Sequence, residues 1–61
     1  MRYRYAKKLH NGDEVTVKRT GEVCRVLSTI EFTDAEGKPE IQVYVQTSQA
    51  GYVNLHHREI S

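Results

Sequence analysis

Three histidines are the residues of this 61-residue chain whose chemistry stands out, because an imidazole can bind a metal ion or transfer a proton near neutral pH. They are His10, His56 and His57. Adjacent side chains on a strand or a tight turn point in different directions, so we expect His56 and His57 not to share one metal ion. The sequence has no paired cysteines that would complete a zinc site. The prediction is therefore surface histidines, no metal ion and no cofactor.

The single cysteine and the carboxylates form no recognisable catalytic set. Cys24 has no fixed histidine partner, so we expect a small buried side chain rather than a nucleophile. The acidic residues around the expected second hairpin are Glu31, Asp34, Glu36 and Glu40. A catalytic pair needs a cleft that shifts one pKa, and a hairpin tip offers water instead. With no phosphate-binding glycine loop or serine-nucleophile motif, we expect no enzymatic activity.

The N-terminal part of the chain is rich in cations, and tyrosines are interleaved with them. Residues 1–25 hold seven Lys and Arg against three acids, a balance of +4, whereas residues 26–61 hold two against five, a balance of −3. Aromatic rings stack on bases while cations neutralise phosphates. The corresponding RNA- or DNA-binding surface would comprise Arg2, Tyr3, Arg4, Tyr5, Lys7, Lys8, Lys18, Arg19 and Arg25. An ordinary solvated surface is the simpler interpretation, since the net charge is only +1.

A second candidate surface combines aromatic rings and amides with few charges, the composition of a protein contact. It lies on the outward positions of the last two long strands, and its members are Gln42, Tyr44, Tyr52 and Asn54. Docking of a protein partner on this face is the function that the sequence favours, and nucleic-acid binding is the alternative. Self-association through an unpaired strand edge or through the N-terminal arm is a third interpretation.

Extended segments must position these side chains. Val15 and Val17 alternate with polar residues, which predicts a strand over residues 14–18 between a turn at Gly12-Asp13 and a reversal at Gly21. Residues 40–46 show the cleanest alternation, and a further strand is expected over residues 52–55. The inward positions of these two strands are Ile41, Val43, Val45, Val53 and Leu55. Residues 56–59 are too few for a stable helix and predict one tight helical turn before Ile60.

The strand expected over residues 22–33 does not keep one phase. Val26, Ile30 and Phe32 share a face, whereas Val23 has the opposite phase. A bulge near Cys24-Arg25 would turn both Val23 and Val26 into the core. Ahead of all these strands, alternation of Tyr and Arg predicts an N-terminal arm or edge strand over residues 1–8, followed by a barrel domain over residues 9–61.

The order of these features resembles the Src-homology-3-like small β-barrels, with the KOW and Tudor-type modules closest. The match rests on Gly12-Asp13-x-Val15-x-Val17, Gly21-x-Val23-x-x-Val26, residues 41–45 and the segment from Tyr52 to Ile60. The resemblance implies an all-β fold, a single five-stranded barrel with a short helical turn before the last strand. KOW-type modules usually have a longer glycine-rich loop between the first two strands, and here only residues 18–21 remain.

Length and composition set outer bounds on this interpretation. A chain of 61 residues that is 38% hydrophobic and 28% charged is a single globular domain with a thin core. One cysteine favours a reducing compartment. No apolar run is long enough for a signal peptide or a membrane span, so we expect a cytoplasmic protein without a membrane partner.

Overall fold

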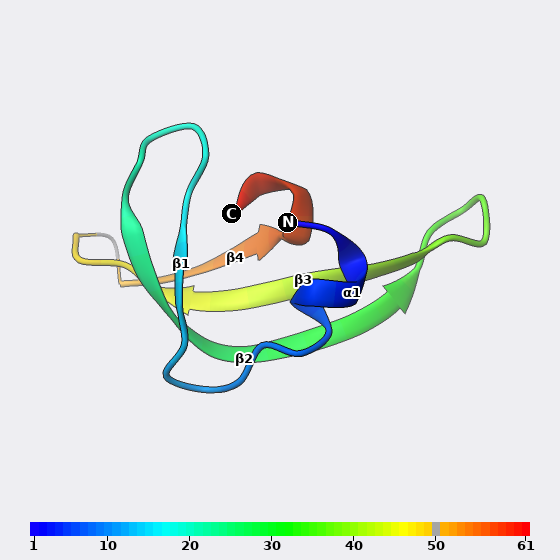
Figure 1. Cartoon of the computed structure of the whole chain (residues 1–61), viewed down its shortest axis with the longest axis horizontal. Coiled ribbons are helices and arrows are strands. Elements are labelled where there is room, and N and C mark those ends of the chain that lie inside the picture. Colours follow the sequence, from blue (N-terminus) through cyan, green and yellow to red (C-terminus); the bar gives the residue numbers. More distant parts are fainter. Residues whose placement is uncertain (50) are drawn as a thin grey trace.

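A computed structural model of the chain describes residues 1–49 and 51–61. One antiparallel sheet of four strands in the order β1-β2-β3-β4 curls into a half-barrel (Figure 1). The elements in chain order are α1 (Tyr3–Ala6), β1 (Glu14–Thr16), β2 (Val23–Thr33), β3 (Pro39–Gln46), β4 (Tyr52–His56) and the 3-10 helix η1 (His57–Glu59). The all-β prediction is confirmed. The prediction of five strands is wrong, because Ile60 forms only an isolated antiparallel bridge with Val17.

The core lies on the concave side of this sheet and consists mainly of valine and isoleucine. Its buried members are Ala6, Val15, Cys24, Val26, Ile41, Val43, Val45 and Ile60. The alternation predicted for residues 40–46 is confirmed, since Ile41, Val43 and Val45 are all buried. Cys24 is buried as expected, and desolvation, reinforced by the nearby Glu22 carboxylate, raises the pKa of its thiol. Most of the apolar side chains that meet in the core therefore come from alternate positions of the strands.

The bulge in β2 lies further along the strand than predicted. Its register against β3 shifts between Val26 and Ser28, so Leu27 is the extra residue. The turn before β1 lies at this point, because the Asn11 side-chain amide donates to the Leu27 carbonyl at 2.9 Å and the Gly12 N–H donates to the Val26 carbonyl at 2.8 Å. Loop contacts of this kind leave no trace in the alternation of apolar residues.

Because the bulge lies at Leu27 and not near Cys24-Arg25, the side chains of β2 that face the core differ from those predicted. Val23, which was expected inside, is exposed, and Cys24 takes the inward position. Beyond the bulge the strand changes phase, so Ile30 and Phe32 are exposed as well, contrary to prediction. The side chains of Val23, Ile30 and Phe32 are therefore exposed on the surface instead of contributing to the core.

The N-terminal residues do not form the extended arm or edge strand predicted for residues 1–8. Tyr3–Ala6 forms the single helical turn α1, in which the Lys7 N–H donates to the Tyr3 carbonyl at 2.9 Å. Tyr3 and Ala6 are three residues apart and therefore share one side of the turn, and both pack against the core. The helical turn buries Ala6, whereas the alternation of Tyr with Arg predicted an extended conformation with a period of two residues.

Candidate functional site

The convex side of the sheet gathers the four residues predicted to contact a protein partner. Tyr44 stands directly opposite Asn54, and Gln46 stands opposite Tyr52. Residues opposite each other in an antiparallel pair point to the same side, as do alternate residues of one strand. Gln42, Tyr44, Tyr52 and Asn54 therefore share one face, with Tyr44 40% and Tyr52 67% exposed.

Two apolar residues extend this face beyond the predicted set. Ile30 pairs with Gln42 across β2 and β3, and Phe32 pairs with Glu40. Both side chains are exposed because of the phase change at the bulge. We call the resulting surface the outer face, and its members are Ile30, Phe32, Gln42, Tyr44, Tyr52 and Asn54. Sequence analysis missed Ile30 and Phe32 because it placed them in the core.

The nine residues of the predicted nucleic-acid surface lie on three separate parts of the chain. Arg2, Arg4, Lys7 and Lys8 are exposed on or beside α1, Lys18 and Arg19 are exposed between β1 and β2, and Arg25 stands opposite Gln46 on the convex side of the sheet.

The two tyrosines of α1 differ in their surroundings. The Tyr3 hydroxyl donates to the Glu31 carboxylate, and the Tyr3 ring meets the His57 ring edge-on at 6.5 Å. Tyr5 is exposed, with the Arg4 guanidinium 5.2 Å from its ring centre. Of the predicted stacking residues, Tyr5 alone presents a largely exposed ring.

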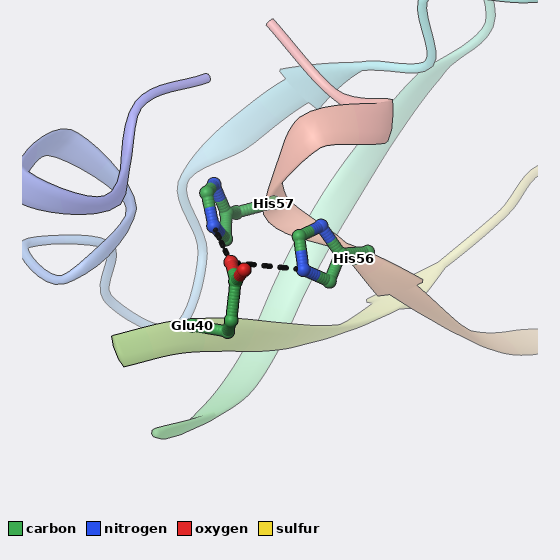
Figure 2. A group of neighbouring side chains, drawn as sticks. All are labelled: Glu40, His56 and His57. Atoms are coloured by element: carbon green, nitrogen blue, oxygen red, sulfur yellow. Dashed lines mark hydrogen bonds and ion pairs between the residues drawn. The ribbon is translucent and has the colours of Figure 1, made fainter. Parts of the chain in front are cut away.

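A buried polar group lies where β4 passes into η1. Glu40 and His57 are 3% and 4% exposed, and they are the buried polar side chains of the described residues. A carboxylate oxygen of Glu40, Oε2, lies 2.5 Å from His57 Nε2 and 3.0 Å from His56 Nε2 (Figure 2). The other oxygen, Oε1, accepts from the Arg58 guanidinium at 2.7 Å. We call Glu40, His56, His57 and Arg58 the Glu40 cluster.

Three expectations about these residues are wrong. His57 is buried rather than on the surface, and the rings of His56 and His57 stack with centres 4.4 Å apart and 29° between their planes. The alternation of side-chain direction ends at His56, where the backbone leaves the extended strand and enters η1. Glu40, which was expected to be solvated, lies beyond the end of β4, where η1 covers it.

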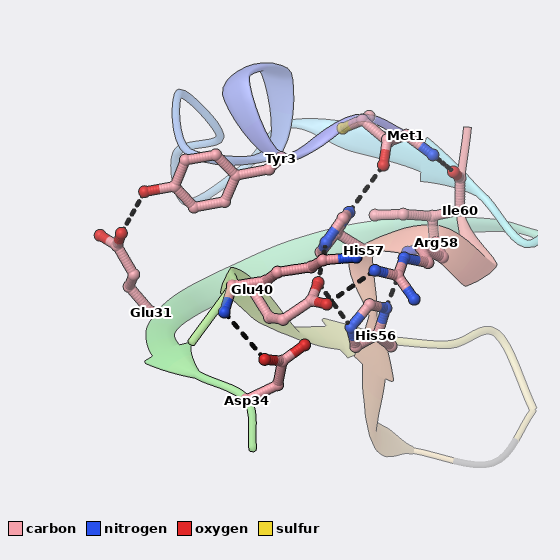
Figure 3. Close-up of polar contacts among 10 residues, drawn as sticks. Met1, Tyr3, Glu31, Asp34, Glu40, His56, His57, Arg58 and Ile60 are labelled. Carbon is pink, nitrogen blue, oxygen red and sulfur yellow. Dashed lines mark hydrogen bonds and ion pairs between the residues drawn. The ribbon is translucent and has the colours of Figure 1, made fainter. Parts of the chain in front are cut away.

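Hydrogen bonds connect the members of the Glu40 cluster with one another and with Met1. His57 Nδ1 is 2.7 Å from the Met1 carbonyl, and Nε2 is 2.5 Å from the Glu40 carboxylate, so each ring nitrogen faces an oxygen (Figure 3). The hydrogen bond with His57 is the main cause that holds the pKa of Glu40 below its ordinary value, and Arg58 acts in the same direction. His56 is a neutral donor at Nε2, because its Nδ1 accepts from the Arg58 N–H at 3.1 Å.

The other predicted carboxylates of the second hairpin have structural partners. Asp34 accepts from the backbone N–H groups of Glu36 and Lys38 at 2.9 and 2.8 Å, which closes the loop between β2 and β3. These bonds, that of Lys38 foremost, lower the pKa of Asp34. A hollow of about 210 Å³ lies elsewhere, lined by Val17, Lys18, Arg19, Leu55 and Glu59. It is smaller than the usual small-molecule site.

Comparison with known proteins identifies no relative. No protein-family model, curated protein or solved structure matches this chain. Among the described residues, no helix has the length and apolar character needed to cross a bilayer. Function is therefore inferred from the outer face, the exposed cations and the Glu40 cluster.

Proposed function

We propose that this chain is a small, non-enzymatic, cytoplasmic binding module of the Src-homology-3-like type, closest to the KOW and Tudor-type barrels, and that it docks a protein partner on the outer face. The observation in favour is the cross-strand register that joins Tyr44, Tyr52, Gln42 and Asn54 with exposed Ile30 and Phe32 on one side of the sheet. Exposed apolar and aromatic side chains grouped on one surface are characteristic of interaction sites.

The chemistry of the outer face suits a protein contact. Tyrosine offers a large ring with few rotatable bonds, so its immobilisation on binding costs little conformational entropy. The amides of Gln42 and Asn54 can donate and accept beside the rings, which favours orientation of a polypeptide. Regular strands hold all six side chains, so little reorganisation is needed when a partner docks.

The proposal is tested by affinity capture with the double variant Tyr44→Ala/Tyr52→Ala. The matched control is Tyr5→Ala, which removes from α1, outside the outer face, a ring whose exposure lies between those of Tyr44 and Tyr52. We expect one partner to be retained by the wild type and by Tyr5→Ala, and lost from the double variant with an unchanged circular-dichroism spectrum. Retention of that partner by the folded double variant would rule out the outer face as its docking site.

Binding of RNA or DNA is the second candidate, and it is favoured by the cations around α1. Arg2, Arg4, Lys7 and Lys8 are exposed, and none forms an ion pair with a carboxylate within residues 1–49 and 51–61. Titration with labelled single-stranded and duplex oligonucleotides at low salt tests this. We expect affinity to fall steeply with added salt and with Arg2→Glu/Arg4→Glu, because phosphate contacts release counterions. Absence of binding at low salt would eliminate this candidate.

A further inference from the structure

The Glu40 cluster brings three metal-ligating atoms together. One ligand atom each from Glu40, His56 and His57 lies within 4.8 Å of the other two, and Figure 2 shows the carboxylate of β3 directed at both imidazoles. Two imidazole nitrogens and one carboxylate oxygen form a ligand set that suits zinc and similar ions, with a fourth position left for water. We propose that these three residues bind a divalent transition-metal ion of the zinc class.

The distances require only a small opening of the site. Zinc bonds to nitrogen and oxygen are about 2.0 to 2.2 Å long, so ligand atoms around a tetrahedral ion lie about 3.3 Å apart. Glu40 Oε2 is 2.5 Å from His57 Nε2 and 3.0 Å from His56 Nε2. These two oxygen–nitrogen separations must grow by less than about 1 Å, and rotation of the His56 side chain, which is 26% exposed, would accommodate this change.

The surroundings already orient two of the ligands. Metal-binding histidines usually donate their second ring N–H to a carbonyl or carboxylate, and His57 Nδ1 is 2.7 Å from the Met1 carbonyl. Ligating carboxylates are themselves hydrogen-bonded, and Arg58 binds Glu40 Oε1 while Oε2 stays directed at the histidines. The positive charge of Arg58 opposes a cation and moderates the affinity.

A metal ion would take the position of a proton. The proton between His57 Nε2 and the Glu40 carboxylate lies where the ion would bind, so an ion bound there displaces that proton into solvent. At His56 the Nε2 proton would move to Nδ1, which ends the 3.1 Å bond from the Arg58 N–H. The cost is one neutral hydrogen bond at the start of η1, which is small beside the binding energy of structural zinc.

The test is titration of the chain with Zn²⁺ alone by calorimetry and with Co²⁺ alone by visible absorption. We expect one ion per chain and affinity at least about tenfold weaker in His56→Gln and in His57→Gln. The matched control is His10→Gln, because His10 is exposed in the turn before β1 and lies outside the Glu40 cluster. The control should bind like the wild type and give the same Co²⁺ spectrum.

Three results would overturn this assignment. They are no saturable binding of either ion, wild-type affinity in folded His56→Gln, and equal loss in His10→Gln. The deciding variant is His56→Gln, because the His56 side chain is 26% exposed whereas His57 is buried. Metal binding by Tyr44→Ala/Tyr52→Ala should equal that of the wild type, so this test is independent of the protein-docking proposal.

Discussion

The outer face and the Glu40 cluster reverse the usual distribution of side chains. On the outer face, aromatic rings and an isoleucine are exposed to water, whereas in the Glu40 cluster a carboxylate and an imidazole are buried. Every buried side-chain nitrogen and oxygen of the described residues has a hydrogen-bond partner, so removal of the Glu40 carboxylate leaves the buried His57 Nε2 unpaired. Truncation of an exposed ring on the outer face should change the free energy of unfolding only slightly. We therefore expect stability to depend on the Glu40 cluster and the core, and recognition to depend on the outer face.

The largest expected effect is that of Glu40→Ala. It leaves the buried His57 and the Arg58 guanidinium without their carboxylate. A domain of this size has a net stability of only about 3 to 5 kcal/mol, so we expect the variant to be largely unfolded. Urea unfolding followed by circular dichroism measures this. Glu36→Ala is the control, since Glu36 is exposed and its ion pair with Lys38 is 3.8 Å long, and it should unfold like the wild type.

The next largest effect is a difference in stability between alanine variants of two isoleucines that lie on opposite sides of the same sheet. Ile41→Ala removes a buried side chain and should lower the free energy of unfolding by about 2 to 5 kcal/mol. Ile30→Ala truncates a side chain that is 54% exposed and should cost about 1 kcal/mol or less. Equal urea midpoints for the two variants would contradict the observed phase of β2.

Acidification should lower the free energy of unfolding by less than the substitutions of Glu40 and Ile41 do. The pKa of Glu40 is lower in the folded chain than its ordinary value of 4.5, so the unfolded chain takes up the proton at higher pH. The stabilisation is complete above that ordinary value and is lost as the pH falls through the lower, folded value. Asp34 acts in the same direction, so the measurement uses Asp34→Asn. Its urea midpoint should still fall with acidification, and a flat profile would contradict the ionised state of Glu40.

The smallest expected effect on stability is that of the outer-face tyrosines. Tyr44→Ala and Tyr52→Ala each remove an exposed ring and should change the free energy of unfolding by about 1 kcal/mol or less. Thermal unfolding of each single variant measures this. A collapse of stability in either one would mean that the ring supports the fold and would weaken the contrast with the Glu40 cluster.

Local patterns predicted the strands but not the contacts between distant segments. Alternation of Ile41, Val43 and Val45 located β3 and its buried side, because a half-buried strand needs period two. The bulge at Leu27 depends on hydrogen bonds from residues 11 and 12, which the pattern of β2 does not contain. For the same reason Ile30 was predicted to be buried.

The outer face was partly predictable and the Glu40 cluster was not. Tyr44 and Tyr52 occupy outward phases of clear strands, so their common side follows from the sequence. Glu40 is separated from His56 and His57 by more than a dozen residues, and they meet only because η1 turns back over the start of β3. An adjacent pair of histidines at the end of a strand was the available signal.

The bridge between Val17 and Ile60 has a consequence for folding kinetics. Together with the bonds between Thr16 and Ser61, it gives β1 its second neighbour from a segment about 40 residues away. Closing so long a loop is slow compared with forming the hairpins of adjacent strands. During synthesis, β1 would therefore pair with β2 alone until Ile60 and Ser61 have left the ribosome.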